Sequence, residues 1–252
     1  VSKNVRVLET GEYICGGQRP NIIDKPTPFK ETLLLAESRM FGSSIASYRN
    51  NPGKTYVKSL FHAAYRREVF EKVGFFNEEL VRTEDNEIHY RMRKAGYKLC
   101  FDPDIISYQY TRSSLKAMLK QKYANGYWIG KTSKVCPKCL SIYHFVPFAF
   151  VSAIIASGSV IGATGLAECI KKRHNHTLGK GISALRKVTV VLTTVMWVLY
   201  ALMASGMAAV SAFKAEDKRN ITNACLPVLF LLLHLSYGIG TIAGLMDKSK
   251  RG

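Results

Sequence analysis

Three long apolar segments limit what this chain can fold into. They cover residues 143–166, 188–213 and 224–246. Each reaches the roughly 20 residues with which a helix crosses a bilayer. The residues before them mix charged and apolar side chains in the manner of a soluble domain. The sequence therefore predicts a soluble part followed by a helical membrane region over residues 143–252.

The positive charge of the chain is concentrated next to the first apolar segment. The net charge is +18, and no acidic residue lies between Asp104 and Glu168. The basic residues in front of the segment are Arg112, Lys116, Lys120, Lys122, Lys131, Lys134 and Lys138. Anionic lipid head groups attract such side chains, whereas no zinc-finger or helix-turn-helix spacing occurs. We therefore expect membrane lipids and no nucleic acid as partners.

Six cysteines are scattered over both parts of the chain. This distribution suits a reduced cytosolic face better than a disulfide framework. Cys136 and Cys139 form one CxxC pair, but a zinc site needs a second pair or further ligands at a defined spacing. We therefore interpret the two as ordinary thiols and predict no metal site in this chain.

The soluble part alternates helical and strand-like patterns, which is typical of mixed α/β folds. A strand over residues 12–15 is expected to end in a turn at Gly16 and Gly17. The remaining pattern predicts helices over 29–41 and 67–73, with Gly74 ending the second, and strands over 56–65, 98–102 and 105–110. The sequence thus predicts an α/β class for this part.

The densest acidic cluster of the chain follows Thr83. Thr83 is a good N-cap, and Glu84, Asp85 and Glu87 fill the first helical turn, where the helix dipole favours negative charge. Capping accounts for one or two carboxylates. It does not account for three of them together with His89, which lies four residues after Asp85 on the same helical face. The cluster is therefore a candidate site.

Residues 113–129 form a basic amphipathic helical pattern that ends in Tyr127 and Trp128. Such a helix suits the plane of a membrane interface. Packing against the soluble domain is an equally good interpretation. We treat residues 113–142 as an interfacial helix with a basic linker to the membrane region.

Several stretches resemble one family of enzymes. Residues 65–105 read YRREVFEKVGFFNEELVRTEDNEIHYRMRKAGYKLCFDPDI. Together with CGGQRP, SRMFGSSIASYRNN, YTRSSLKAMLKQKYANGYW and HLSYGIGTIAGL, they resemble family two glycosyltransferases, in particular membrane-attached transferases of the succinoglycan-biosynthesis type. The order and spacing of several unrelated elements agree.

The resemblance implies a GT-A fold, in which a Rossmann-like half binds the nucleotide and a second half receives the acceptor. Residues 1–112 resemble the acceptor half. The nucleotide-binding strands and the metal-binding Asp-x-Asp element of the family would lie before Val1. A divalent cation, Mg²⁺ or Mn²⁺, is therefore expected in the full-length protein, with ligands mostly outside this chain.

The resemblance also implies roles for single residues. The Thr-Glu-Asp match places the catalytic base at Asp85, where a carboxylate can take the proton of an attacking hydroxyl. We expect partial burial to offset the helix dipole, which would otherwise weaken Asp85 as a base. Glu84 is expected either to orient acceptor hydroxyls or to pair with an arginine.

Further positions match the cleft of the family. Gly16 and Gly17 are expected on the donor side and Arg66 on the acceptor side, the alternative for Arg66 being a solvated helix start. Gln121 and Trp128 fall where processive relatives carry Gln-x-x-Arg-Trp, although the spacing is longer here and the arginine is absent. We expect both to contact the acceptor.

The membrane arrangement has two alternatives. Activated sugars are cytosolic, so the soluble part is expected on the cytoplasmic side. If all three segments cross, residues 167–187 lie outside with six basic residues and one acidic, against the usual excess of Lys and Arg inside. A re-entrant or interfacial hairpin in 143–166, favoured by Pro147 and Gly158, would return them to the cytosol. We favour the hairpin.

These features predict a multi-pass, inverting glycosyltransferase of the cell membrane. It would move a sugar from a nucleotide donor to a lipid-linked or polysaccharide acceptor in exopolysaccharide or cell-surface glycan synthesis. One alternative is a non-catalytic membrane subunit or scaffold of a polysaccharide export complex. A membrane-tethered binder of polyanions is another, and it requires steeply salt-dependent affinity for DNA or RNA.

Overall fold

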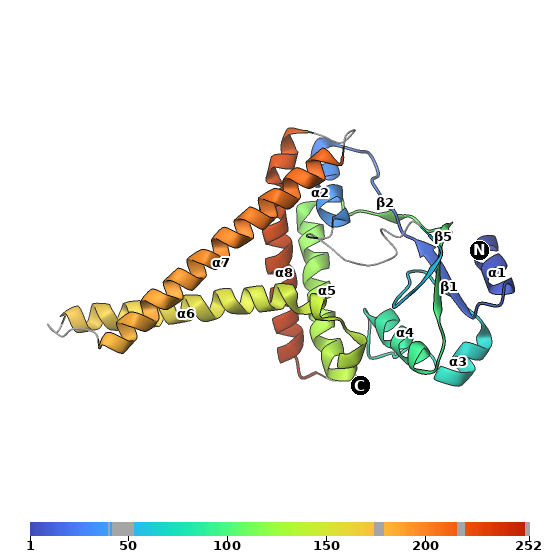
Figure 1. The fold of residues 1–252 in the computed structure, drawn as a ribbon, viewed down its shortest axis with the longest axis horizontal. Helices are drawn as coiled ribbons and strands as arrows, with labels where there is room; N and C mark the ends of the chain where they lie inside the picture. Colours follow the sequence, from blue (N-terminus) through green and yellow to red (C-terminus); the bar gives the residue numbers. More distant parts are fainter. Residues whose placement is uncertain (40, 42–52, 174–178, 216–219, 250–252) are drawn as a thin grey trace.

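The computed structural model describes residues 1–39, 41, 53–173, 179–215 and 220–249. They form an α/β part at one end and a long projection of two helices at the other, with two adjacent helices between them (Figure 1). The combination of a mixed α/β sheet with long apolar helices confirms the expected fold class in its coarse form.

Within the described residues, a four-stranded sheet has the order β3-β5-β1-β4. Its central strands, β1 (Ile14–Gln18) and β5 (Leu99–Ile106), are parallel. The short strands β3 (Thr55–Val57) and β4 (Ala64–Tyr65) pair antiparallel with β5 and β1. The sheet therefore has a parallel core with antiparallel edges.

The prediction of a turn at Gly16 and Gly17 is wrong, because both glycines lie inside β1. A Cβ on Gly17 would overlap the carbonyl oxygens of Asp102 and Ile105. The missing side chain therefore lets β1 and β5 approach each other closely. The local sequence does not distinguish a glycine with this role from a glycine in a turn.

The buried strand predicted over residues 56–65 is also wrong. The segment contains two short strands with different partners, and Tyr56 is 54% exposed. Between the strands, His62 has a φ of 49°. A non-glycine residue in the left-handed region interrupts an extended chain, so the segment turns instead of continuing.

The residues around Pro103 form one strand, not the two predicted on either side of it. β5 passes through Pro103, and its register with β1 shifts between Gly16 and Gln18. A strand tolerates proline where its pairing is irregular in this way. Beyond the shift, β2 (Asn21–Ile22) and β6 (Gln109–Tyr110) pair as a parallel two-stranded ribbon.

Helices cover the sheet and connect it to the rest of the molecule. Their bounds are α1 (Ser2–Glu9), α2 (Pro28–Ser38), α3 (Arg67–Val73) and α4 (Glu84–Lys94). Residues from the sheet, α3 and α4 form one buried cluster: Ile14, Leu60, Val69, Ile88, Met92, Leu99 and Phe101. α4 is thus fixed on the sheet by its apolar face, which leaves its first turn free for other contacts.

The helical part contains α5 (Leu115–Val135), α6 (Val146–Arg173), α7 (Lys180–Phe213) and α8 (Leu226–Met246). The short helices η2 (Pro137–Cys139), η3 (Ile142–Phe145) and η5 (Ile221–Cys225) join them. Among the described residues, three helical stretches that contain α6, α7 and α8 are long and apolar enough to cross a membrane.

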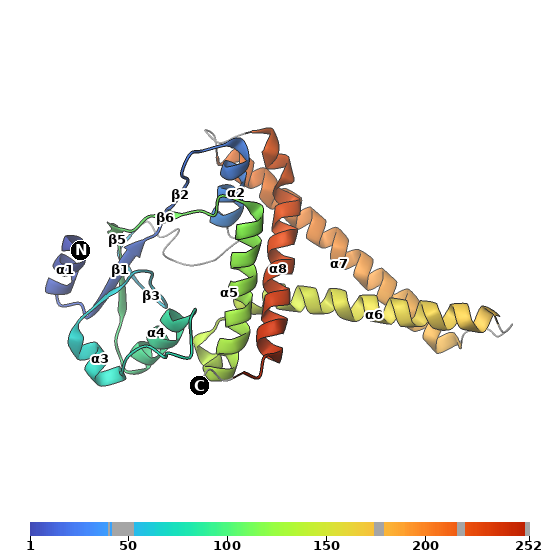
Figure 2. The ribbon, with the colours of Figure 1, turned by 180° about the vertical axis from the view of Figure 1, so that it is seen from behind.

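α5 and α8 lie side by side in Figures 1 and 2 and run in the same direction. Glycines make the contact close: a Cβ on Gly126 would overlap the backbone of Tyr237, and one on Gly240 would overlap that of Tyr123. Small residues at a helix interface allow such an approach. α5 thus packs closely on α8, and its placement at a membrane interface stays a prediction.

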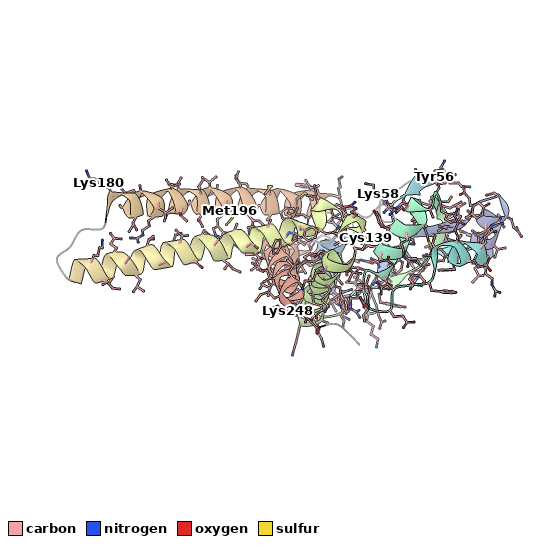
Figure 3. All side chains as sticks on the ribbon, turned by 90° about the horizontal axis from the view of Figure 1, so that it is seen from below. Tyr56, Lys58, Cys139, Lys180, Met196 and Lys248 are labelled. Atoms are coloured by element: carbon pink, nitrogen blue, oxygen red, sulfur yellow. The ribbon has the colours of Figure 1, made fainter. Side chains whose placement is uncertain are left out.

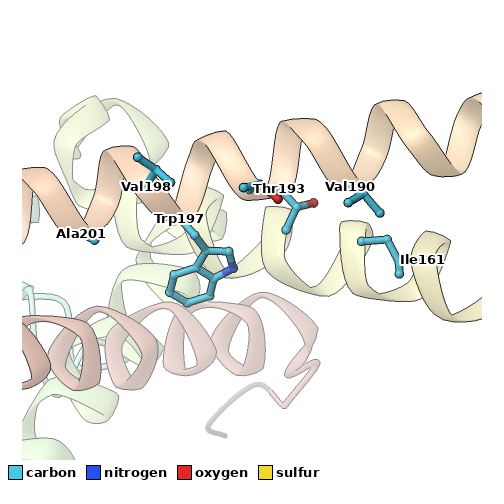
Figure 4. A pocket seen from close by; sticks show the side chains of 7 residues that line it. Ile161, Val190, Thr193, Trp197, Val198 and Ala201 are labelled. Carbon is cyan, nitrogen blue, oxygen red and sulfur yellow. The ribbon is translucent and has the colours of Figure 1, made fainter.

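The prediction of a hairpin within residues 143–166 is wrong, because α6 is one helix of 28 residues. Gly158 and Gly162 lie within it, and a Cβ on either would meet no neighbouring atom within 4 Å. α6 and α7 project together from the other helices (Figure 3). Between them is an apolar hollow of about 390 Å³, lined by residues such as Ile161, Val190 and Trp197 (Figure 4).

Candidate functional site

The acidic cluster lies in the first turn of α4 and Thr83 is its N-cap residue, as predicted, but the side chain of Thr83 does not cap the helix. Thr83 has a left-handed backbone conformation with a φ of 69°, and its side chain makes no capping hydrogen bond. Instead its hydroxyl lies against the hydroxyl of Thr132 on α5. This conformation is costly for a β-branched residue, so contacts with α5 hold the start of α4 in an unusual form.

A second contact ties the same turn to α5. The guanidinium of Arg82 donates a hydrogen bond to Asn125 Oδ1 at 2.7 Å. Asn125 and Thr132 share a helical face with the predicted acceptor residues Gln121 and Trp128, because their spacings are close to whole turns. The structure therefore brings the face of α5 that carries Gln121 and Trp128 to the start of α4.

Asp85 is partly buried, and burial raises the pKa of its carboxyl group to about 6. The charge of Glu84 raises the pKa further, whereas a hydrogen bond from the backbone N–H of Asn86, 2.8 Å from Oδ1, and the charge of Arg19 lower it. The carboxylate is thus mostly ionised near neutral pH but more basic than an ordinary aspartate. These are the properties of a general base.

The three carboxylates of the cluster have different surroundings. Glu87 is buried and accepts from the Nε of Arg91 at 2.7 Å, and Arg91 also donates to the carbonyl oxygen of Phe75 at 2.6 Å. Glu87 therefore stabilises the fold. Glu84 has a buried carboxylate oxygen, Oε2, without a hydrogen-bond partner among the described residues. Such an atom is costly to bury alone, which suggests a ligand.

Beside Asp85 lies a hydrogen-bonded group that sequence reasoning identified only in part. His89 is buried, and its Nε2 is 2.8 Å from the Tyr65 hydroxyl and its Nδ1 3.1 Å from the Ser59 hydroxyl. Burial lowers the pKa of His89 to about 4. Burial and the charge of Asp85 raise the pKa of Tyr65. Both groups are therefore uncharged at neutral pH and are held by hydrogen bonds to each other and to Ser59.

Sequence reasoning missed a set of polar side chains on the two-stranded ribbon. Asn21 and Gln109 face each other across β2 and β6, and Thr111 follows two residues later. Both amide atoms of Asn21, Oε1 of Gln109 and the hydroxyl of Thr111 are buried without a partner in the described parts of the chain. Oε1 of Gln121 on α5 shares this property. In the sequence, the alternation of these polar residues with apolar ones such as Ile22 and Tyr110 is the signal that could have indicated them.

Arg66 and the two glycines have clear structural surroundings. The Nε of Arg66 donates to the carbonyl oxygen of Glu12 at 3.0 Å, and its Nη2 donates to that of Leu8 at 2.6 Å. It therefore ties the start of α3 to the end of α1 and to the segment that follows it. Gly16 and Gly17 are buried in β1. The roles predicted for these three residues in binding stay predictions.

Among the described residues, no group of three or more His, Cys, Asp or Glu side chains could hold a metal ion. Cys136 and Cys139 are free thiols. The described residues around Asp85 thus do not fit a divalent cation.

Comparison with known proteins gives a family match over most of the chain. The profile of the family described as "Glycosyl transferase family group 2" matches residues 29–240. Residues 40, 42–52, 174–178 and 216–219 of this range lie outside the described residues. No solved structure gives a significant match.

Three curated relatives match shorter stretches. The chain is similar to the succinoglycan biosynthesis protein ExoA of Rhizobium meliloti, with 26% identity over 39% of the chain and 30% of the relative. It is also similar to O-antigen chain rhamnosyltransferases of Salmonella anatum, with 33% identity over 35% and 28%, and of Salmonella typhimurium, with 31% over 39% and 32%. The chain thus aligns with about a third of each relative.

Proposed function

Because the chain belongs to glycosyl transferase family group 2, we propose that it forms the acceptor half of a membrane-bound, inverting glycosyltransferase. The enzyme transfers a sugar from a nucleotide-sugar donor to a lipid-linked or polysaccharide acceptor. The names of the relatives, which refer to succinoglycan and O-antigen synthesis, support such acceptors. The observation that carries the proposal is the basic, partly buried carboxylate of Asp85.

The proposed reaction follows from the position of this carboxylate. Asp85 takes the proton of an acceptor hydroxyl while the hydroxyl oxygen forms a bond to the anomeric carbon of the donor sugar. The bond from that carbon to the nucleotide breaks, and the nucleotide leaves with the bonding electrons on its phosphate. Attack from the face opposite the leaving group inverts the anomeric centre. A base with a pKa near neutrality suits this step.

The polar atoms without partners provide acceptor contacts in this proposal. Glu84 lies next to the base, and Gln121 projects from the face of α5 that meets the start of α4. Asn21, Gln109 and Thr111 add donors and acceptors on the ribbon. Sugar hydroxyls can both donate and accept, so they match amide, carboxylate and hydroxyl groups alike.

Other parts of the enzyme are proposed to lie outside the described residues. A divalent cation, Mg²⁺ or Mn²⁺, which is common in this family, would take its ligands from there because the described residues do not form a metal site. The nucleotide-binding half would also be supplied from there. The soluble part faces the cytoplasm in this proposal, where nucleotide sugars are found.

The proposal is tested by supplying radiolabelled nucleotide sugars, one at a time, to membranes that contain the full-length protein. We expect one of them to label the lipid or polysaccharide fraction, and membranes without the protein to stay unlabelled. A non-catalytic scaffold predicts no labelling with any donor although the protein is present at its normal level. That result would contradict the proposed function.

A further inference from the structure

Both ends of α8 are fastened to the same side of the molecule. At its start, in η5, Asn223 Oδ1 accepts a hydrogen bond from the buried hydroxyl of Thr32 on α2, at 2.7 Å. At its end, Asp247 accepts from the hydroxyl of Tyr127 and pairs with Lys131 Nζ at 3.4 Å, both on α5. α8 has 21 residues and is therefore about 32 Å long. A helix crossing a bilayer core of about 30 Å would have its ends on opposite sides.

α5 follows α8 along most of this length and belongs to the soluble part. Leu119 accepts a hydrogen bond from Ser236, and Lys134 donates to the carbonyl oxygen of Asp247. The opposite face of α5 contacts the start of α4 through Asn125. If α8 crossed a membrane, α5 and the adjoining α/β part would enter the hydrocarbon with it. Charged side chains in that region are strongly disfavoured.

The free face of α8 is an aliphatic stripe. Val228, Ile239 and Met246 are exposed by 59%, 49% and 73%. The stripe follows helical spacing over the whole helix and consists of Val228, Leu232, Leu235, Ile239, Ile242 and Met246. It lies away from the glycine contacts with α5. A stripe of this composition fits the acyl chains just below lipid head groups.

The face of α5 beside its contact with α8 has a complementary composition. Its stripe consists of Lys116, Lys120, Tyr123, Tyr127, Lys131 and Lys134. It flanks the contact with α8, because the backbones of Tyr123 and Tyr127 border Gly240 and Gly244 of α8. Lysines attract anionic lipid head groups, and tyrosines favour the interface.

α6 and α7 differ from this pair. They have 28 and 34 residues, or about 42 and 51 Å, and Lys180 lies at the far end of the projection from Lys248 (Figure 3). Near that far end, Arg186 of α7 pairs with Glu168 of α6. Leu192, Val198 and Leu202, farther along α7, are all more than half exposed. This is the pattern of a helix pair surrounded by lipid.

We propose that α5 and α8 lie flat in the head-group interface of an anionic bilayer and that α6 and α7 alone cross it as a hairpin. α8 is then a platform and not a membrane span, although its length and composition are those of one. The far ends of α6 and α7, which carry Lys171, Lys180 and Lys187, lie on the side opposite the soluble part, and the length of the two helices takes these charges beyond the hydrocarbon. This inference does not depend on the proposed transferase activity.

Thiol accessibility in the full chain tests the arrangement. Cys169 is exposed near the far end of α6. Two other reporters are introduced singly after Cys136, Cys169 and Cys225 have been replaced by serine: Glu71→Cys on the soluble part and Lys248→Cys after α8. We expect an impermeant maleimide to label Glu71→Cys and Lys248→Cys from one side and Cys169 from the other, with equal labelling after solubilisation. Every other pattern of sides overturns the proposal.

Measuring how deep spin labels lie in the bilayer tests the same arrangement without relying on any one cysteine variant. Spin labels are placed singly at Val228, Ile239 and Met246 in vesicles of mixed phosphatidylglycerol and phosphatidylcholine, with a label at Val195 in the middle of α7 as the control. We expect the three α8 labels at one shallow depth and the control near the bilayer centre. If the label at Ile239 lies deeper than those at Val228 and Met246, α8 crosses the bilayer and the proposal is wrong.

Discussion

At the scale of single residues, Asp85 is held in a state that weakens the fold and favours proton transfer. Burial disfavours its charged form, and Glu84 adds a second negative charge beside it. A hydrogen bond from the Asn86 N–H keeps the carboxylate ionised near neutral pH all the same. The sequence located Asp85 and Glu84 but not Asn21 or Gln109, because the burial of a polar side chain depends on what lies across from it in the folded chain.

Replacing Glu84 by glutamine should move the acid limb of the pH profile. The charge of Glu84 raises the pKa of Asp85, so its removal lowers that pKa. A base must be deprotonated, and kcat/KM of the full-length protein should therefore fall at a lower pH in Glu84→Gln than in the wild type. The control is Glu78→Gln, an exposed carboxylate. An acid limb that stays in place, or moves to higher pH, contradicts the assignment.

Replacing Asp85 by asparagine should stabilise the fold. The pKa of Asp85 is raised to about 6 from an ordinary value of 3.8. Its contribution to stability is therefore fully present below the unfolded pKa and is lost as the pH rises from about 4 to 6. At pH 7 the ionised group destabilises the fold by about 3 kcal/mol, which asparagine avoids. Thermal unfolding in detergent should show a higher midpoint for Asp85→Asn at pH 7 and none of this gain at pH 4.

At the scale of elements, α5 is the helix on which the others depend. One face meets the start of α4 through Asn125 and Thr132, a second packs on α8 through Gly126 and Gly130, and a third is exposed. Periodicity predicted this helix and the other long ones. Periodicity did not predict the strands correctly. Gly17 allows the close approach of β1 and β5, and His62 has a positive φ. Both features depend on contacts between segments that are distant in the sequence.

Enlarging Gly126 should separate α5 from α8. Even a Cβ there overlaps the Tyr237 backbone, so Gly126→Leu forces the helices apart at a cost of about 1 to 3 kcal/mol or more. The matched control is Gly158→Leu on α6, where a Cβ meets no neighbour within 4 Å. We expect a lower unfolding temperature in detergent and faster proteolysis for Gly126→Leu only. Equal behaviour of the two variants would show that the α5–α8 contact is absent.

At the scale of the whole molecule, the fold connects the candidate site around Asp85 to the proposed membrane platform. The start of α4, which carries Asp85, is fixed to α5, and α5 is fixed to α8. In the proposed arrangement, these contacts hold Asp85 at a fixed distance from the membrane surface, where a lipid-linked acceptor would bind. Sequence predicted three apolar helices of sufficient length. It did not predict the position of α8, which depends on contacts such as that between Thr32 and Asn223.

The loss of sugar transfer in Asp85→Asn tests the role of Asp85 most directly. It is measured with the full-length protein in membranes, beside Glu78→Gln and with protein levels matched. We predict a fall in the transfer rate of roughly 10²- to 10⁴-fold for Asp85→Asn and no change for Glu78→Gln. Transfer at the wild-type rate by Asp85→Asn would contradict the assignment of Asp85 as the base.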